Sequence, residues 1–260
     1  MAFYYTRSCK IINCLLTFYF LIISLACYTQ INNNIRQDDF FYISGNIKKH
    51  VSPNSIQQID SIAHTTGIAS HFAKVYSQSM GNIAIQMQKE DSGANNFIKQ
   101  FEIGFAGYFL DACMEEKDGN FSPAPVWKCY FSSIDAQPWQ MVLLGVNAHI
   151  NGEMWRALVE NFSQNDIRRY KKQFLELQLS VAKLYNPFFD TIMVQNNYLR
   201  FINGFTKGLA RKFGERVVYK WRRRQVQLAI LFYHAPEKFR KRQALVNRKK
   251  QRVDQLILRK

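Results

Sequence analysis

Apolar residues recur at helical spacing along most of the chain after residue 53. The clearest run alternates steps of three and four residues: Ile167, Tyr170, Phe174, Leu177, Val181 and Leu184. This spacing places all of them on one face of an amphipathic helix. Either Ser163 or Asn165 can cap the first turn of that helix, and Pro187 is expected to follow its end.

Further helices are expected on both sides of this run. Apolar residues recur at helical steps within residues 56–80, 97–113, 126–134, 190–206, 207–233 and 236–257. A segment rich in glycine, asparagine and proline, residues 118–125, is expected to form a loop. Alternation typical of a strand occurs only near Phe41–Ile43. The pattern therefore predicts an all-α protein.

The stretch that follows Pro138 predicts the helix at the centre of the fold. Its apolar residues lie on every side of the helical axis, which is typical of a helix buried all round. Pro138 stands where the first helical turn is expected, a position that proline favours. We therefore expect a single compact multi-helix domain, residues 55–260, built around a buried central helix at about residues 139–160.

Four polar side chains interrupt this apolar helix: Asn147, His149, Asn151 and Glu153. A buried polar group without a partner costs about 1–3 kcal/mol. The helix therefore holds either an internal hydrogen-bond network or a functional site. His149 and Glu153 are four residues apart, so they share a helix face on which they are candidate catalytic residues, ligand-binding groups or metal ligands. Asn147 and Asn151 form a second such pair and are candidate ligand-binding residues.

Two neighbouring features bear on that site. Gly145 and Gly152 flank the histidine and predict room for a neighbouring backbone or a ligand. His64 and His71 are seven residues apart on the first predicted helix, and they are the nearest candidates for completing a metal site with the central histidine and glutamate. Surface or core-edge positions are the alternative for both histidines. The sequence assigns no cofactor.

The net charge of +16 is concentrated in the C-terminal segment. Residues 207–260 contain 18 Lys and Arg against 3 Asp and Glu, whereas residues 1–206 contain 17 against 16. The run Trp221–Arg224 and the segment Lys238–Lys250 favour an anionic partner. Outside the cytoplasm that partner is expected to be a phospholipid or glycolipid surface, and nucleic acid is disfavoured. A solvated cationic face is the alternative.

The first 26 residues resemble an export signal. Arg7 and Lys10 precede an apolar run that ends at Ala26, and Ser24-Leu25-Ala26 fits cleavage after Ala26. Lipid modification of Cys27 and retention as an uncleaved membrane anchor are the alternatives. Each places the following residues outside the cytoplasm, in the periplasm or at the membrane of the cell envelope. Residues 27–54 are polar and are expected to form a tether.

Other motifs limit the possible chemistry. The chain lacks the G-x-S-x-G, phosphate-binding glycine-loop, H-E-x-x-H and C-x-x-C patterns, so the common hydrolase, nucleotide-binding and zinc-protease classes have no support. Cys113 and Cys129 are the cysteines that follow the first 54 residues. They are expected either to pair in an oxidising compartment or to remain free thiols.

The nine residues Leu143–Asn151 resemble the signature L-L-G-x-N-A-H-I-N of an uncharacterised, mostly bacterial family of all-helical proteins. Weaker matches occur in the same order as in that family: Gly67–Tyr76, Phe105–Ala112, Pro125–Trp127 and Trp221–Arg224. The resemblance implies an all-helical fold and marks the central helix, but it carries no assigned activity. Glu153 stands where an aspartate is usual in that family.

The sequence thus favours an exported helical protein that binds a small or lipidic ligand in a polar pocket on the central helix. The alternative is a hydrolase or lyase that uses His149 as its base or as a metal ligand. A structural protein without a ligand is the third interpretation.

Overall fold

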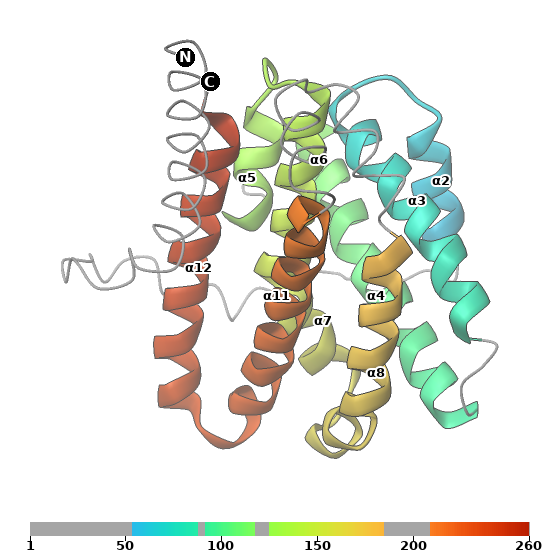
Figure 1. The fold of residues 1–260 in the computed structure, drawn as a ribbon, viewed down its shortest axis with the longest axis vertical. Coiled ribbons are helices and arrows are strands. Elements are labelled where there is room, and N and C mark those ends of the chain that lie inside the picture. The colour runs from blue at the N-terminus through green and yellow to red at the C-terminus, as the bar shows by residue number, and fades with distance from the viewer. Residues whose placement is uncertain (1–53, 88–91, 118–124, 185–208, 260) are drawn as a thin grey trace, which may run out of the picture. The chain divides into compact units, whose positions relative to one another are not determined.

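The computed structural model describes residues 54–87, 92–117, 125–184 and 209–259. All secondary structure in these ranges is helical, so the predicted all-α class is confirmed (Figure 1). None of the helices in these ranges is long and apolar enough to cross a membrane. The expected export signal, the polar tether, the strand near Phe41–Ile43 and the helix at residues 190–206 lie outside the described residues.

The first predicted helix is two helices, α2 (Ser55–Ala63) and α3 (Ile68–Met87). A single helix over residues 56–80 was therefore a wrong prediction. Gly67, with φ of 116°, explains the break, because residues other than glycine rarely adopt this backbone conformation. The N–H groups of His64 and Thr65 close the turn by donating to carbonyls of the last turn of α2.

The next helices agree more closely with the hydrophobic pattern. Helix α4 (Ser92–Lys117) extends beyond both ends of the predicted run, α5 (Pro125–Ser132) is short, and α8 (Gln164–Leu184) covers the clearest amphipathic run. Ser163 is the residue that caps α8. Its Oγ accepts from the Asp166 N–H at 3.2 Å, and its own N–H donates to Asp166 Oδ2 at 3.2 Å.

The central helix is present, but it is not a regular α-helix. It consists of α6 (Pro138–Val146), a π-helical segment η2 (Asn147–Glu153) and α7 (Met154–Asn161). At its start, the Gln137 N–H donates to Gln140 Oε1 at 2.9 Å, which satisfies a donor that the first turn leaves open. In a π turn each N–H bonds five residues back, so the turn is wider than an α turn. The hydrophobic pattern gave no sign of this irregularity.

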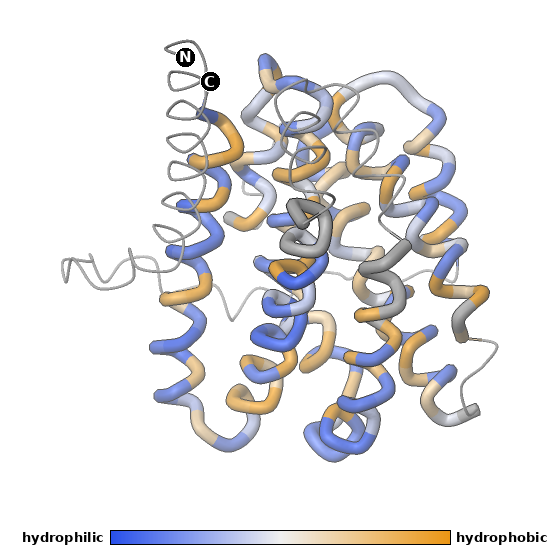
Figure 2. The backbone as a smooth tube through the Cα atoms, viewed as in Figure 1, coloured by the Kyte–Doolittle hydropathy of each residue, from blue (hydrophilic) through white to orange (hydrophobic). Residues whose placement is uncertain are grey.

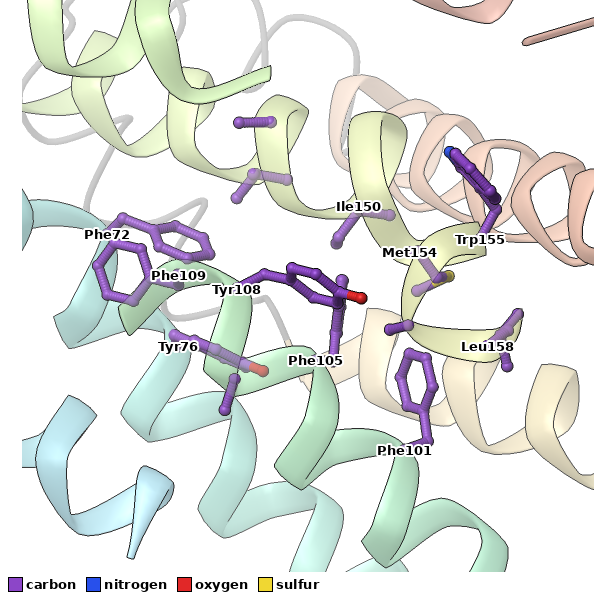
Figure 3. Close-up of a cluster of buried hydrophobic side chains, with 14 of the residues drawn as sticks. Phe72, Tyr76, Phe101, Phe105, Tyr108, Phe109, Ile150, Met154, Trp155 and Leu158 are labelled. Atoms are coloured by element: carbon purple, nitrogen blue, oxygen red, sulfur yellow. The ribbon is translucent and has the colours of Figure 1, made fainter. Parts of the chain in front are cut away.

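Helices on several sides enclose the central element. Segment η2 contacts α5, α11 (Leu209–His234) and α12 (Pro236–Leu258), while α6 contacts α3 and α7 contacts α4. The largest completely buried side chains come from this assembly: Trp127, Tyr130, Phe101, Phe109, Phe174, Ile59, Ile98, Met141, Leu144, Met154, Leu158 and Ile167. Figure 3 shows how aromatic side chains of α3 and α4 gather beside the central helix. The central position of this helix is confirmed.

Helices α11 and α12 form a helical hairpin that turns at Ala235 (Figure 1). Hydrophilic positions predominate along α12 and in the middle of α11 (Figure 2). Apolar residues of both helices, among them Leu228, Phe239 and Val246, are buried against the core. Most of the described basic side chains of the hairpin are exposed and therefore lie away from the core.

Cys113 and Cys129 are free thiols. Burial raises the pKa of Cys113 to about 12. Burial also raises the pKa of Cys129, with a further contribution from the Asp254 charge. Of the two outcomes left open by the sequence, the structure therefore shows the unpaired one, with both thiols protonated at neutral pH.

Candidate functional site

The π segment carries all four polar candidates and buries them completely. The exposed fractions are 0 % for Asn147, 2 % for His149, 0 % for Asn151 and 3 % for Glu153. The four side chains divide into two groups with different surroundings. The Asn147 side chain bonds to α12 and accepts a hydrogen bond from Asn151, whereas His149 and Glu153 lie among aromatic rings.

The asparagines join the central helix to α12. Asn147 Nδ2 donates to the Lys250 carbonyl at 3.0 Å and to Asp254 Oδ1 at 2.8 Å. Asn151 Nδ2 donates to Asn147 Oδ1 at 3.0 Å. On the α11 side, Gln225 accepts from the Trp155 N–H at 3.0 Å and donates to the Asn151 carbonyl. These contacts stabilise the packing of the central helix and use the Nδ2 groups of both asparagines and Asn147 Oδ1, whereas Asn151 Oδ1 is buried without a hydrogen-bond partner among the described residues.

A buried ion pair extends this network. Lys250 Nζ lies 2.7 Å from Asp254 Oδ2 and also donates to the Val126 carbonyl of α5. Lys250 is therefore not part of the cationic surface expected from the segment Lys238–Lys250, and Arg222, 4 % exposed, is not part of the surface expected from Trp221–Arg224. A basic residue in a charged run is a poor guide to exposure when one helix face packs against the core.

The His149 imidazole lies in an aromatic enclosure. It stacks on the Phe105 ring with a centroid distance of 3.4 Å and an interplanar angle of 12°. The rings of Tyr76 and Phe72 approach it edge to face, with centroids at 4.6 and 5.3 Å. Figure 3 shows these three aromatic side chains projecting from α3 and α4. The enclosure excludes bulk water and holds the plane of the imidazole.

Glu153 connects His149 to a tryptophan of α5. Trp127 Nε1–H donates to Glu153 Oε1 at 2.9 Å, and His149 Nδ1 lies 3.4 Å from the same oxygen. The other atoms of this pair, His149 Nε2 and Glu153 Oε2, are buried and have no hydrogen-bond partner among the described residues. The pair is thus oriented through one nitrogen and one oxygen, and the second atom of each is left available.

Burial keeps both members of this pair uncharged at neutral pH. It holds the pKa of His149 well below the usual 6.5, and the nearby Arg222 charge acts in the same direction. Burial raises the pKa of Glu153 from 4.5 to about 8, against the opposing effects of the Trp127 hydrogen bond and the Arg156 and Lys250 charges. A neutral imidazole with a bonded Nδ1 can accept a proton or a hydrogen bond at Nε2.

A small cavity adjoins the imidazole. Its volume is about 20 Å³, and its lining includes His149, Tyr76, Phe105, Ser79, Glu102 and Arg222. This is enough room for about one molecule the size of water. Glu102 and Arg222, both 4 % exposed, bring an acidic and a basic group to the same cavity as the imidazole. The cavity therefore combines apolar walls with hydrogen-bonding groups of both kinds.

The two glycines beside the histidine do not leave space for a ligand. A Cβ atom added to Gly145 would lie 2.6 Å from the Phe72 ring, and one added to Gly152 would lie 2.5 Å from Val126 Cγ1. Protein side chains fill the room that the glycines create. Of the two alternatives that the glycines left open, the ligand is not the one found: the missing Cβ atoms admit side chains of α3 and α5 close to the central helix.

The metal candidates do not come together. His64 is exposed at the end of α2, where its Nδ1 lies 2.8 Å from the Asp60 carbonyl, and His71 is half-buried on α3. Among the described residues no three His, Cys, Asp or Glu side chains are grouped as a metal ion would require. His149 and Glu153 are thus the members of the proposed set that the structure places in contact.

Three residues of the site were not anticipated from the sequence. Trp127 was named only as part of the weaker match Pro125–Trp127, and Arg222 was interpreted as part of a basic run that favours an anionic partner. Glu102 was not considered, although it is an acidic residue within a strongly apolar helix, which is a usable signal for a buried charge. For Arg222, the signal was its spacing of four and seven residues from Val226 and Ala229, which are buried.

The fold and the site define an all-helical domain built around a buried polar π turn. Residues 54–259 match the model of a family of unknown function (DUF5995). The match spans most of the chain, so the protein belongs to this family, and the resemblance to an uncharacterised helical family is confirmed. No curated protein and no solved structure matches the chain.

Proposed function

We propose that the protein binds a small polar ligand in the cavity beside His149. One observation carries this proposal: the buried Nε2 atom of His149 has no hydrogen-bond partner among the described residues, and its imidazole lines the cavity. An unsatisfied buried nitrogen costs about 1–3 kcal/mol. A ligand that bonds to Nε2 would offset this cost.

The surroundings of His149 support a polar ligand of few atoms. The aromatic walls favour a compact molecule, and the volume of about 20 Å³ excludes a large one without movement of the side chains. Glu102 and Arg222 give the lining a hydrogen-bond acceptor and a donor in addition to the imidazole. Binding sites of this composition, apolar with a few placed polar groups, are common among small-molecule sites.

Three small probes test the proposal: acetate, methanol and methylammonium, each carrying one methyl group that NMR can observe. We expect at least one of them to bind the full-length protein saturably and to shift the ring ¹⁵Nε2 resonance of His149. The variant His149→Phe keeps an aromatic ring against Phe105 and removes both nitrogens. Its binding of that probe should be lost.

The matched control is His64→Phe, the same substitution at an exposed histidine outside the cavity. It should bind the probe as the wild type does. Absence of saturable binding for all three probes would overturn the proposal, as would equal binding by His149→Phe.

A hydrolase or lyase that uses His149 as its base is the second candidate. It is favoured by the distance of 3.4 Å between His149 Nδ1 and Glu153 Oε1, which orients the ring and leaves Nε2 as the basic atom. Hydrolysis of a small ester, methyl formate, which has no more heavy atoms than acetate, tests this. The rate should fall at least a hundredfold in His149→Phe and should stay constant from pH 7 to below pH 6, because the pKa of His149 is held well below 6.5 and Glu153, with a pKa of about 8, is still protonated at pH 7. A rate that is unchanged in the variant excludes the role.

We also propose that the chain is exported. Support comes from the positively charged start, the apolar run and the Ser24-Leu25-Ala26 sequence within residues 1–26. Lipid modification at Cys27 and an uncleaved anchor are the alternative outcomes.

A further inference from the structure

The α11–α12 hairpin gathers basic side chains from both of its helices. Arg242, Lys249 and Arg252 follow one another on α12 at intervals of seven and three residues, which keeps them on one helix face. Arg224 on α11 lies 11 residues before the turn at Ala235, and Arg242 and Lys249 on α12 lie 7 and 14 residues after it. In an antiparallel pair of helices these spacings place Arg224 between the levels of Arg242 and Lys249. The four cations thus form one cluster across the two helices.

The four charges of this cluster repel one another. Burial lowers the pKa of Lys249, and the charges of Arg224, Arg242 and Arg252 lower it further. Burial and the Arg242 charge lower the pKa of Arg224. The effect of one charge on the pKa of another requires the two cations to be close in space. A bound anion would relieve this repulsion.

The carboxylates of α12 are engaged with other residues. Glu237 forms an ion pair with Arg240, and Asp254 pairs with Lys250 inside the protein, with 2.7 Å between Lys250 Nζ and Asp254 Oδ2. Positive charge therefore predominates on the outer side of the hairpin, in agreement with the many hydrophilic positions along α12 in Figure 2.

We propose that the cluster of Arg224, Arg242, Lys249 and Arg252 is a docking surface for the phosphate head groups of an anionic phospholipid membrane. Guanidinium groups suit phosphate because their N–H donors form paired hydrogen bonds with its oxygens. A lipid surface presents many phosphates in one plane, and the basic side chains of a straight helix can meet several of them at once.

A phospholipid surface is favoured over nucleic acid by the burial of a nearby tryptophan and by the proposed export of the chain. The nearby Trp221 is half-buried and packs against the hydrophobic core, so it does not offer a ring on which a base can stack. The export proposed from residues 1–26 would also place the hairpin outside the cytoplasm, where phospholipid is the common phosphate-bearing surface. Duplex DNA is the competitor that the experiment must include.

The test compares two double variants of the full-length chain with equal loss of charge. Arg242→Ala/Lys249→Ala removes two cations from the cluster, and Lys74→Ala/Lys99→Ala removes two exposed cations from α3 and α4. Binding is measured with vesicles of phosphatidylglycerol and phosphatidylcholine, with vesicles of phosphatidylcholine alone, and with a 20-base-pair DNA duplex. Circular dichroism verifies that each variant keeps its helical content.

We expect the cluster variant to bind the anionic vesicles about 25-fold more weakly, since each basic residue near a membrane contributes roughly a fivefold factor. The α3–α4 variant should lose less than threefold, and Arg242→Lys/Lys249→Arg should bind as the wild type does. Equal losses in both alanine variants would show a net-charge effect and overturn the proposal. An unchanged affinity in the cluster variant, or a loss confined to DNA, would also overturn it.

Discussion

The sharpest prediction concerns the substitution Glu153→Gln and the pH dependence of stability. Burial raises the pKa of Glu153 to about 8 in the folded protein, whereas the ordinary value is 4.5. Folded Glu153 therefore keeps its proton over a pH range in which the unfolded chain has released it. A glutamine has nearly the same shape as a protonated glutamate and cannot ionise, so it removes this difference.

The sign and size follow from proton linkage. Above pH 6.5 the folded state binds one more proton than the unfolded state, so the free energy of unfolding falls as the pH rises, by up to about 1.4 kcal/mol per pH unit. From pH 6.5 to pH 8, where folded Glu153 is half ionised, the fall is about 2 kcal/mol. In Glu153→Gln this fall should be absent.

His149 produces the opposite slope at lower pH. The pKa of His149 is well below 6.5 in the fold, so below pH 6.5 the unfolded chain gains a proton that the folded chain does not. In the wild type the proton retained by Glu153 opposes this effect below pH 6.5. In Glu153→Gln the opposing effect is lost, and stability should fall on acidification below pH 6.5 by up to about 1.4 kcal/mol per unit.

The assay is urea unfolding of full-length wild type, Glu153→Gln and Glu176→Gln at half-unit intervals from pH 5 to pH 8. Glu176 is exposed on α8, so its substitution controls for the loss of a carboxylate at the surface. The stability of Glu153→Gln minus that of the wild type should rise by about 2 kcal/mol between pH 6.5 and pH 8. A flat difference, or an equal rise in Glu176→Gln, would refute the reasoning.

Three further predictions concern other parts of the structure. Lys250→Met should lower the free energy of unfolding by about 3–5 kcal/mol because it leaves Asp254 charged and buried, and adding Asp254→Leu should recover part of the loss in urea unfolding. Gly145→Ala should cost about 1–3 kcal/mol through contact with an aromatic ring, whereas Gly81→Ala, which meets no atom within 4 Å, should be neutral or stabilising in thermal unfolding. Cells fed a palmitate analogue should label the exported protein only if Cys27 is lipid-modified, and Cys27→Ala should then abolish the label; an unprocessed cytosolic chain would contradict export.

Hydrophobic spacing was a good guide to the helices because each helix buries one face. The run from Ile167 to Leu184 was predicted almost to its ends, since its six apolar residues form a single stripe. The break at Gly67 was missed because apolar residues on both sides of it continue the same spacing. Backbone conformation at one glycine is decided by the packing of α2 against α3, which the spacing does not describe.

The candidate site was located by the sequence but not resolved by it. Polar residues in an apolar helix marked Asn147–Glu153, and all of them are buried. Their partners come from residues far away in the chain, such as Trp127 on α5 and Asp254 on α12. No local pattern distinguishes an asparagine that bonds to a distant helix from one that binds a ligand. Which polar atoms of the site bond to distant helices and which stay without a partner could therefore be decided only from the fold.

The π turn explains how seven residues serve both purposes. Hydrogen bonds from Asn147 to Lys250 and Asp254 hold the turn against α12. In the His149–Glu153 pair of the same turn, His149 Nε2 and Glu153 Oε2 stay without a hydrogen-bond partner among the described residues, at a cost of about 1–3 kcal/mol each. A fold that needed only a packed core would replace these two residues with apolar ones. Their presence inside a widened turn, a geometry that often occurs at functional sites, supports the proposal that the cavity beside His149 binds a ligand.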